Sequence, residues 1–213
     1  MHMAKRTGAH IHVSDIVPYL ARECRMYGRS ASPGTIQGAL FDATKMPLPD
    51  AIYAFAYSVS VLEHIPNQGD TLAIKEISRV LRPGGRVVIT VPCVPEYREI
   101  WSKKDPFGSQ PKDDAGRYFF GRWYDWNTIE ARIIVPSGLT LVESSLYQER
   151  TSGWYERYCR TTENPLSLRS IVAKLFDPIW IHKNVERCVK SRQQVVSHGL
   201  AILLLEKPPS ACA

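Results

Sequence analysis

The sequence predicts an α/β fold built on a parallel sheet. Residues 51–58 form a short apolar and aromatic run that is typical of a buried strand, and residues 86–91 form a second, β-branched run. Between them, the apolar residues within 73–81 recur with the spacing of one helical face, and Pro83-Gly84-Gly85 ends that helix. A strand, a helix and a second strand in this order form a βαβ unit, whose crossover joins parallel strands.

The composition is that of a soluble globular protein with room for one domain and a substantial core. The 213 residues are 44% hydrophobic and 23% charged, and no apolar stretch is long enough to span a bilayer. Residues 1–8 lack the apolar core of a signal peptide. We therefore expect a cytoplasmic protein without a transmembrane segment.

Charge and cysteine content argue against several classes of site. The net charge of +6 is mildly basic, but the basic residues are not massed in one run, so we expect no specific nucleic-acid partner. The five cysteines are widely scattered and form no C-x-x-C pair. This pattern predicts no metal site and favours free thiols over a disulfide framework.

Two segments of the βαβ unit carry a family pattern. Residues 61–65 read Val-Leu-Glu-His-Ile and residues 80–86 read Val-Leu-Arg-Pro-Gly-Gly-Arg, with the helix between them. In this order and spacing they resemble the class I S-adenosylmethionine (SAM) dependent methyltransferases of the methyltransferase type 11 kind. The resemblance implies a Rossmann-like sheet, mostly parallel with strand seven antiparallel, and SAM as the cofactor. The implied activity is methyl transfer to an unidentified acceptor, either a small molecule or a lipid- or sugar-linked group.

The family's first strand and glycine-rich turn have no counterpart in the sequence. Family members begin with a strand, a G-x-G-x-G turn and a helix, whereas residues 4–8 resemble only the end of that helix. We therefore expect a sheet that lacks strand one and has an open edge, which a second copy of the chain or another partner can cover. The alternative function is a catalytically inactive, truncated methyltransferase-fold binding module or partner subunit.

The resemblance places the cofactor site at the ends of three predicted strands. The matching positions are Asp15, Ile16, Asp42, Ala43, Ser58, Val59 and Ser60. Asp15 follows the alternating segment 10–14, and the resemblance implies that its carboxylate accepts hydrogen bonds from the ribose hydroxyls. Asp42 follows the strand predicted over 35–41 and matches a residue that binds the adenine amino group. From the residues alone, Asp15 is better explained as a helix cap, and Asp42 can begin an ordinary turn.

His64 is the candidate catalytic base. The ordinary pKa of histidine suits proton transfer near neutral pH, and some family members have a histidine near the transferred methyl group. The alternative is a histidine that hydrogen-bonds a nearby loop. Methyl transfer can also proceed mainly through alignment of the nucleophile with the methyl group.

The segment 93–128 is rich in aromatic, proline and charged residues and has no clear period. It resembles the variable segment that covers the active site in this family. Tyr118, Trp123 and Tyr124 are the candidate residues of the acceptor pocket, since aromatic side chains line many small-molecule sites. Packing of these side chains against the sheet is the alternative.

The rest of the chain completes the predicted domain. Residues 1–148 and 199–213 are expected to form the methyltransferase-like α/β domain, with residues 149–198 as a helical insertion, or lid, within it. The further elements expected are helices over 18–27, 129–135, 168–176 and 185–196, an Asn127-Thr128 cap on the second helix, and strands over 139–147 and 199–206.

Overall fold

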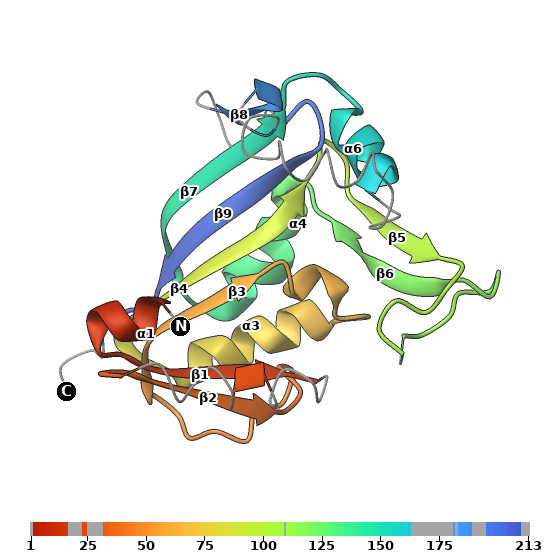
Figure 1. The fold of residues 1–213 in the computed structure, drawn as a ribbon. Helices are drawn as coiled ribbons and strands as arrows, with labels where there is room; N and C mark the ends of the chain where they lie inside the picture. Colours follow the sequence, from red (N-terminus) through yellow and green to blue (C-terminus); the bar gives the residue numbers. More distant parts are fainter. Residues whose placement is uncertain are drawn as a thin grey trace.

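A central sheet of five strands organises the computed structural model (Figure 1). The structure describes residues 2–16, 23–24, 32–108, 110–162, 181, 183–188 and 195–209. In their order across the sheet, the strands are β3 (Tyr53–Val59), β4 (Leu81–Cys93), β9 (Gly199–Glu206), β7 (Thr140–Glu149) and β8 (Val185–Cys188). β3 and β4 are parallel, whereas β9 is antiparallel to both of its neighbours. The prediction of an antiparallel strand seven is therefore confirmed.

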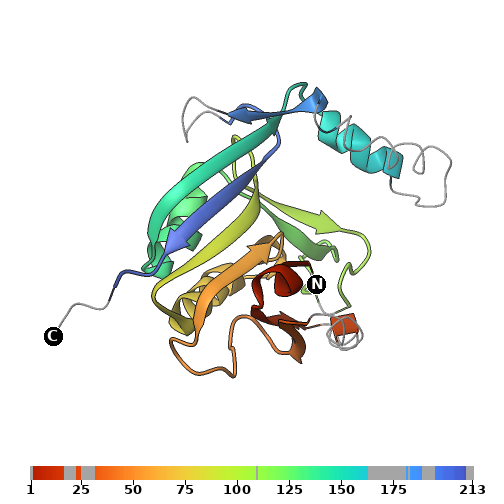
Figure 2. The ribbon, with the colours of Figure 1, turned by 60° about the vertical axis from the view of Figure 1, so that its left-hand side comes forward.

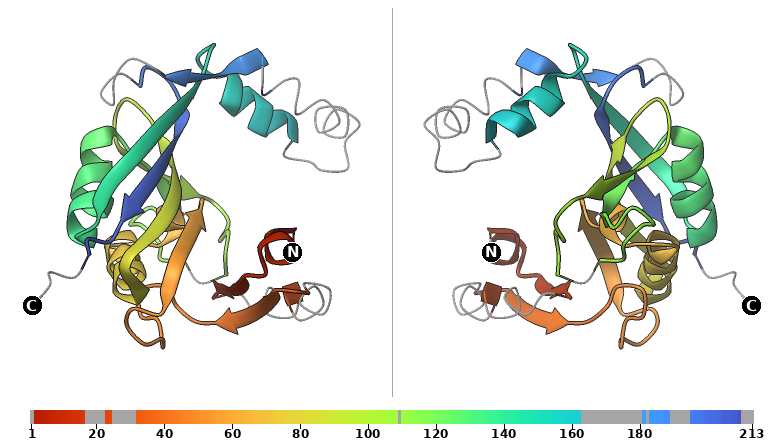
Figure 3. Two further views of the ribbon diagram at one scale, coloured as in Figure 1. Left: turned by 90° about the vertical axis from the view of Figure 1, so that its left-hand side faces the viewer. Right: turned by 90° about the vertical axis from the view of Figure 1, so that its right-hand side faces the viewer.

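Two helical segments cover one face of this sheet (Figure 3). The first is α3 (Gly69–Val80), the predicted crossover helix between β3 and β4. The second runs without a break through α4 (Trp126–Ile129), the π-helical turn η2 (Glu130–Ile134) and α5 (Val135–Ser137). Within the described part of the chain, no helix combines the length and the apolar content needed to cross a membrane.

The ends of the second helical segment correct one detail of the prediction. The N-cap is Asp125 rather than the Asn127-Thr128 pair, because the Asp125 Oδ1 accepts a hydrogen bond from the Thr128 N–H at 2.7 Å. This bond satisfies one of the free N–H groups of the first helical turn. Gly138 ends the segment with a φ of 65°, a left-handed conformation that glycine adopts without steric cost.

The main core lies between these helices and the sheet. The helices contribute Ile74, Ile77, Ile129 and Ile133, and alternate positions of β4 and β9 contribute Val87, Ile89, Val91, Ala201, Leu203 and Leu205. Burying one such large aliphatic side chain stabilises the fold by about 1.5–3 kcal/mol. The helix-covered face of the sheet is therefore where most of the hydrophobic stabilisation arises.

The strand register places another set of side chains on the opposite face. Tyr57 pairs with Val88, and Val88 pairs with Leu204, so these three side chains share a face that does not belong to the core. On β3 this face is open, since Phe55 is 47% and Val59 is 58% exposed. The cavity described below lies on this face, at the C-terminal end of β4.

A separate parallel pair, β1 (His10–Asp15) and β2 (Thr35–Leu40), follows the short helix α1 (His2–Thr7). Figures 1 and 2 show this pair apart from the central sheet. Within the described residues, no ladder joins β1 to β3, and His12 Nδ1 instead contacts the Tyr53 hydroxyl across the gap. The break between the sheets lies where the sequence predicts a missing strand.

The segment predicted only as a variable cover contains an antiparallel hairpin. Its strands are β5 (Arg98–Ser102) and β6 (Tyr118–Trp123), and the isolated bridge between Cys93 and Tyr124 ties its end to the central sheet. The two strands pair across an intervening loop. This pairing, rather than the local strand propensity of either segment, determines that both are strands.

One helix predicted within the insertion is wrong in its first residues. The helix α6 (Trp154–Thr162) is present, but residues 185–188 of the helix expected over 185–196 form β8. They pair with the last residues of β7, whose edge supplies hydrogen-bond partners that local sequence does not reveal. The helix predicted over 168–176 lies outside the described residues. Of the helix predicted over 18–27, only residues 23–24 are described, and they are helical.

Candidate active site

The ends of β1 and β2 bring the predicted cofactor carboxylates to one edge of the fold. The N–H of Phe41, just after β2, donates to the carbonyl oxygen of Asp15 at 3.2 Å. Asp15 is partly buried, and the adjacent Ile16 is 54% exposed. Ligands of open α/β sheets bind at such C-terminal strand ends, and the role of Asp15 in cofactor binding stays a prediction.

Asp42 forms a turn at the same edge. Its Oδ1 accepts hydrogen bonds from the N–H and the hydroxyl of Thr44, both at 2.8 Å. This is the Asx-type turn that short polar side chains favour, and Asp42 is exposed while Ala43 packs against the core. The turn alternative is therefore realised in the structure, and the adenine contact stays a prediction.

The end of β3 has an unusual backbone. Ser58 is buried and Val59 is exposed, and Ser60 follows with a φ of 51°. The Ser60 N–H bonds both the carbonyl oxygen and the Oγ1 of Thr90, at 3.2 Å and 3.0 Å. A left-handed conformation is uncommon for residues other than glycine and tends to occur at functional sites.

The chemistry of this edge fits the ribose and adenine portions of SAM. Carboxylates at the ends of adjacent parallel strands offer acceptors to a vicinal diol and to an amino group, which is the arrangement of Asp15 and Asp42. Within the described ranges, no group of three or more His, Cys, Asp or Glu side chains is arranged to hold a metal ion.

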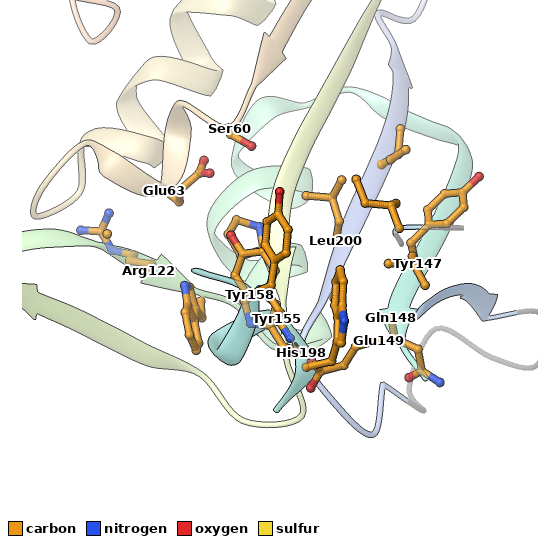
Figure 4. Close-up of a pocket in the computed structure, with 18 of the residues that line it drawn as sticks. Ser60, Glu63, Arg122, Tyr147, Gln148, Glu149, Tyr155, Tyr158, His198 and Leu200 are labelled. Atoms are coloured by element: carbon orange, nitrogen blue, oxygen red, sulfur yellow. Dashed lines mark hydrogen bonds between the residues drawn. The ribbon is translucent and has the colours of Figure 1, made fainter. Parts of the chain in front are cut away.

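A cavity of about 590 Å³ lies beside Ser60 (Figure 4). Pro92 of β4 and Leu200 and Ile202 of β9 line it from the face of the sheet opposite the core. The other walls are largely aromatic, from Phe120, Trp123, Tyr147, Trp154, Tyr155 and Tyr158. A cavity of this size with few polar groups suits a small molecule that has an apolar body.

Glu63 is a buried carboxyl group at the Ser60 end of the cavity (Figure 4). Its side chain is 3% exposed, and the neighbouring Ser60 hydroxyl and its own N–H favour the charged form of the carboxyl group. Its Oε2 is buried and has no hydrogen-bond partner among the residues that the structure describes. Burial raises the pKa of Glu63 to about 7, because it penalises the charged carboxylate. Sequence reasoning missed this residue, although the S-x-x-E spacing from Ser60 is that of a capping box.

His64 lies between the cavity and the hairpin. Its Nδ1 donates to the carbonyl oxygen of Phe120 at 2.6 Å, and since a carbonyl only accepts, the Nδ1 carries a proton. The imidazole also meets the rings of Phe107 and Phe120 at centroid distances of 5.1 Å. A Cβ on Gly121 would lie 3.0 Å from Nδ1, so glycine permits this close approach. The loop contact proposed as the alternative role is therefore present, and the role as a base stays a prediction.

A buried polar network fixes the hairpin beside the cavity. Asp70, fully buried at the start of α3, accepts hydrogen bonds from Arg132 at 2.6 Å and 2.8 Å and from the Tyr124 hydroxyl at 2.9 Å. Arg122, 1% exposed on β6, donates to two carbonyl groups of the loop 65–67. Burial raises the pKa of Tyr124, so its hydroxyl remains a donor. These contacts of Asp70, Arg132 and Arg122 thus hold the wall of the cavity in one position.

The three aromatic residues predicted for the acceptor pocket have different environments. Trp123 lines the cavity. Tyr124 is fully buried and holds Asp70, and Tyr118 lies under the Lys112 ammonium group, which is 4.7 Å from its ring centroid. Neither Tyr118 nor Tyr124 lines this cavity, so packing, the alternative considered for them, describes both.

His198 marks the opposite end of the cavity from Glu63 (Figure 4). Its ring stacks on Tyr155 at 4.3 Å and meets Trp123 edge-on at 4.4 Å. Its Nδ1 is buried and has no hydrogen-bond partner within the described ranges, and burial lowers the pKa of His198. Nearby, the Glu149 carboxylate accepts hydrogen bonds from the N–H groups of Gly153 and Tyr155, both at 2.7 Å. The largely apolar cavity therefore has polar groups near Glu63 and near His198.

Comparison with known sequences links the first part of the chain to a family. Residues 1–89 match the family model of the methyltransferase domain. The chain is 42% identical over 48 residues to a sterol 4-C-methyltransferase of Caenorhabditis elegans, and 30% identical over 93 residues to an O-methyltransferase of Aspergillus sclerotiorum. These matches cover 22% and 44% of this chain, and 14% and 33% of the two relatives. The chain thus matches only part of either protein.

Solved structures share the fold over nearly the whole chain. The [4+2]-cyclase SpnF aligns with a TM-score of 0.60 at 16% identity, covering 98% of this chain and 71% of its own. A SAM-dependent methyltransferase from Methanosarcina mazei aligns at 0.56 and 14%, covering 98% and 86%. A geranyl diphosphate C-methyltransferase from Streptomyces coelicolor, solved with S-adenosyl-L-homocysteine, aligns at 0.55 and 12%, covering 97% and 65%. The match links residues 1–89 to the methyltransferase-domain family, and the solved structures show that the chain shares the fold of SAM-dependent methyltransferases.

Proposed function

We propose that the protein transfers a methyl group from SAM to a largely apolar acceptor, a small molecule or a lipid-linked group that carries a hydroxyl. The position of Ser60 carries this proposal. Ser60 ends β3 at the predicted cofactor edge, and it also lines the aromatic cavity. A methyl donor held at the strand ends and an acceptor held in the cavity therefore meet at this residue.

The residues at the strand ends are assigned to the cofactor. SAM supplies an electrophilic methyl group on a sulfonium sulfur. The Asp15 and Asp42 carboxylates offer acceptors to its ribose and adenine, and the exposed Ile16 and Val59 offer apolar surface beside them. The left-handed backbone of Ser60 sets the direction of the chain where it leaves β3, at the other end of the predicted cofactor site.

The cavity positions the acceptor and excludes water. Its aromatic walls bury an apolar body, and the network around Asp70 and Arg122 keeps the hairpin closed against η1 (Leu62–His64). Holding a nucleophile in line with a methyl donor can itself remove about 7–11 kcal/mol of the barrier. The names of the similar proteins agree with this class of acceptor, since they include a sterol methyltransferase, an O-methyltransferase and a geranyl diphosphate methyltransferase.

Calorimetric titration with S-adenosyl-L-homocysteine, the product of the cofactor, tests this proposal. We expect binding by the wild-type chain and weaker binding by Asp15→Ala. The matched control is Asp114→Ala, which removes an exposed carboxylate from the β5–β6 loop. A folded chain that does not bind the product contradicts the proposed function.

The open edge of β3 favours a second candidate, a binding module that keeps the fold without the chemistry. Phe55, Tyr57 and Val59 expose about half of their surface each, and the described residues pair β3 on one side only. Such an edge can accept a strand from a second copy or another partner. Light scattering that finds a dimer, together with no cofactor binding, favours this candidate over the enzyme.

A further inference from the structure

We propose that Ser60 and Glu63 form a proton relay, in which the Ser60 hydroxyl receives the acceptor's proton and passes its own to the Glu63 carboxylate. This inference rests on the proposed methyl transfer and deepens it. It also narrows the acceptor to molecules that lose a proton from a hydroxyl group when they are methylated.

The geometry supplies both parts of the relay. Ser60 is exposed and lines the cavity, whereas the Glu63 side chain is 3% exposed behind it. Ser60 and Glu63 both line this end of the cavity (Figure 4), and the Ser60 hydroxyl is close enough to the Glu63 carboxyl group to favour its charged form. Among the described residues, the Glu63 Oε2 has no hydrogen-bond partner. An acceptor hydroxyl in the cavity can therefore reach Ser60, which connects it to a carboxylate shielded from water.

In the described part of the chain, no arginine or lysine side chain forms an ion pair with Glu63. On its own element, the His64 Nε2 lies 3.9 Å from Glu63 Oε1, but the protonated Nδ1 is directed to the Phe120 carbonyl. On β6, Arg122 is committed to backbone carbonyls, and beyond it Tyr124 donates to Asp70. The raised pKa of about 7 follows from this burial. A carboxylate with such a pKa is matched to general-base catalysis at neutral pH.

The proton step balances in atoms and in charge. The acceptor O–H bond breaks as its oxygen forms a bond to the methyl carbon, and the bond from that carbon to the sulfonium sulfur breaks. The acceptor's proton goes to the Ser60 oxygen, and the Ser60 proton goes to Glu63. The positive sulfonium and the negative carboxylate thus become a neutral thioether and a neutral carboxylic acid, so no net charge is left in the apolar cavity.

The first test observes Glu63 without any reaction. In protein labelled with ¹³C at the glutamate carboxyl carbon, the Glu63 resonance is the one that Glu63→Gln removes. We expect it to titrate near pH 7, and to titrate at a higher pH in Ser60→Ala, because the lost hydrogen bond had favoured the charged form. Titration near the ordinary glutamate value, about 4.3, overturns the relay whatever the activity.

The second test measures methyl transfer from radiolabelled SAM to two probes, 2-naphthol and ergosterol. We expect Glu63→Gln to lower kcat by about 10²–10⁴-fold. Its Kd for S-adenosyl-L-homocysteine should stay within twofold of the wild-type value. The rise of kcat/KM toward pH 7 should disappear in Glu63→Gln and persist in His64→Asn. Glu130→Gln, which changes an exposed carboxylate on the helix-covered side, is the matched control.

The outcomes separate the two proposals. Wild-type methylation of either probe, with an equal rate and the same pH profile in Glu63→Gln, overturns the relay and leaves methyl transfer standing. A folded wild-type chain that neither binds S-adenosyl-L-homocysteine nor methylates a probe overturns the proposed function, and the relay with it.

Discussion

Replacing Glu63 with glutamine should stabilise the protein at pH 8 and change its stability little at pH 4. Burial raises the pKa of Glu63 from 4.5 in the reference state to about 7 in the folded protein. The folded state therefore binds this proton more tightly than the unfolded chain, so ionisation of the carboxyl group lowers the free energy of unfolding. This loss begins as the pH rises through about 4.5 and is complete above about pH 7. At 1.36 kcal/mol per pKa unit, the shift corresponds to about 3 kcal/mol.

Urea denaturation followed by circular dichroism at the two pH values measures this difference. We expect Glu63→Gln to exceed the wild type by about 3 kcal/mol at pH 8, or by roughly 6–12 °C in Tm for a domain of this size. The other titrating groups are common to both proteins, so the comparison isolates Glu63. Glu130→Gln, at an exposed position, should show no such pH dependence. A stability difference between Glu63→Gln and wild type that is equal at both pH values refutes the reasoning.

Three further substitutions probe the attachment of the hairpin. Gly121→Ala places a methyl group 3.0 Å from the His64 Nδ1. The resulting displacement of the imidazole or the hairpin should lower kcat/KM for 2-naphthol by about 10–100-fold. An unchanged kcat/KM argues against close packing of Gly121 on His64. Asp70→Asn leaves Arg132 without its buried carboxylate and should cost about 3–5 kcal/mol in urea denaturation. Tyr124→Phe removes one hydrogen bond to Asp70 and should cost about 1–3 kcal/mol by the same measurement. A larger loss for Tyr124→Phe than for Asp70→Asn contradicts the assignment of Asp70 as the centre of the network.

The central βαβ unit could be predicted because its information is local. The apolar period of α3 and the Pro83-Gly84-Gly85 break lie within one short stretch, and the last strand appears with the bounds expected, Gly199–Glu206. The hairpin β5–β6 and the strand β8 could not be predicted in the same way. Their residues become strands by pairing with partners distant in the chain, and such pairing outweighs intrinsic preference.

The candidate site also has parts that could be predicted from the sequence and parts that could not. Asp15, Asp42 and Ser60 could be placed at strand ends, because a family pattern and the geometry of parallel sheets both point there. The cavity could not be predicted, since its walls come from segments that lie far apart in the sequence, including those of Tyr147 and His198. The environment of Tyr124 depends on Asp70, a residue far from it in sequence, so its burial in the core has no local signal.

Two unfavourable features meet at the same turn, and their coincidence favours a functional role. The left-handed backbone of Ser60 costs about 1–3 kcal/mol, and the ionised, unpaired Glu63 costs about 3 kcal/mol. The fold can pair a buried carboxylate, as it does at Asp70 with Arg132, whereas the nearby Arg122 donates to backbone carbonyls instead. In natural proteins, residues that break the local rules of folding occur mainly at functional sites. A carboxylate left unpaired beside a strained serine, between a cofactor edge and an apolar cavity, is suited to taking up a proton, and stability alone gives no reason to retain it.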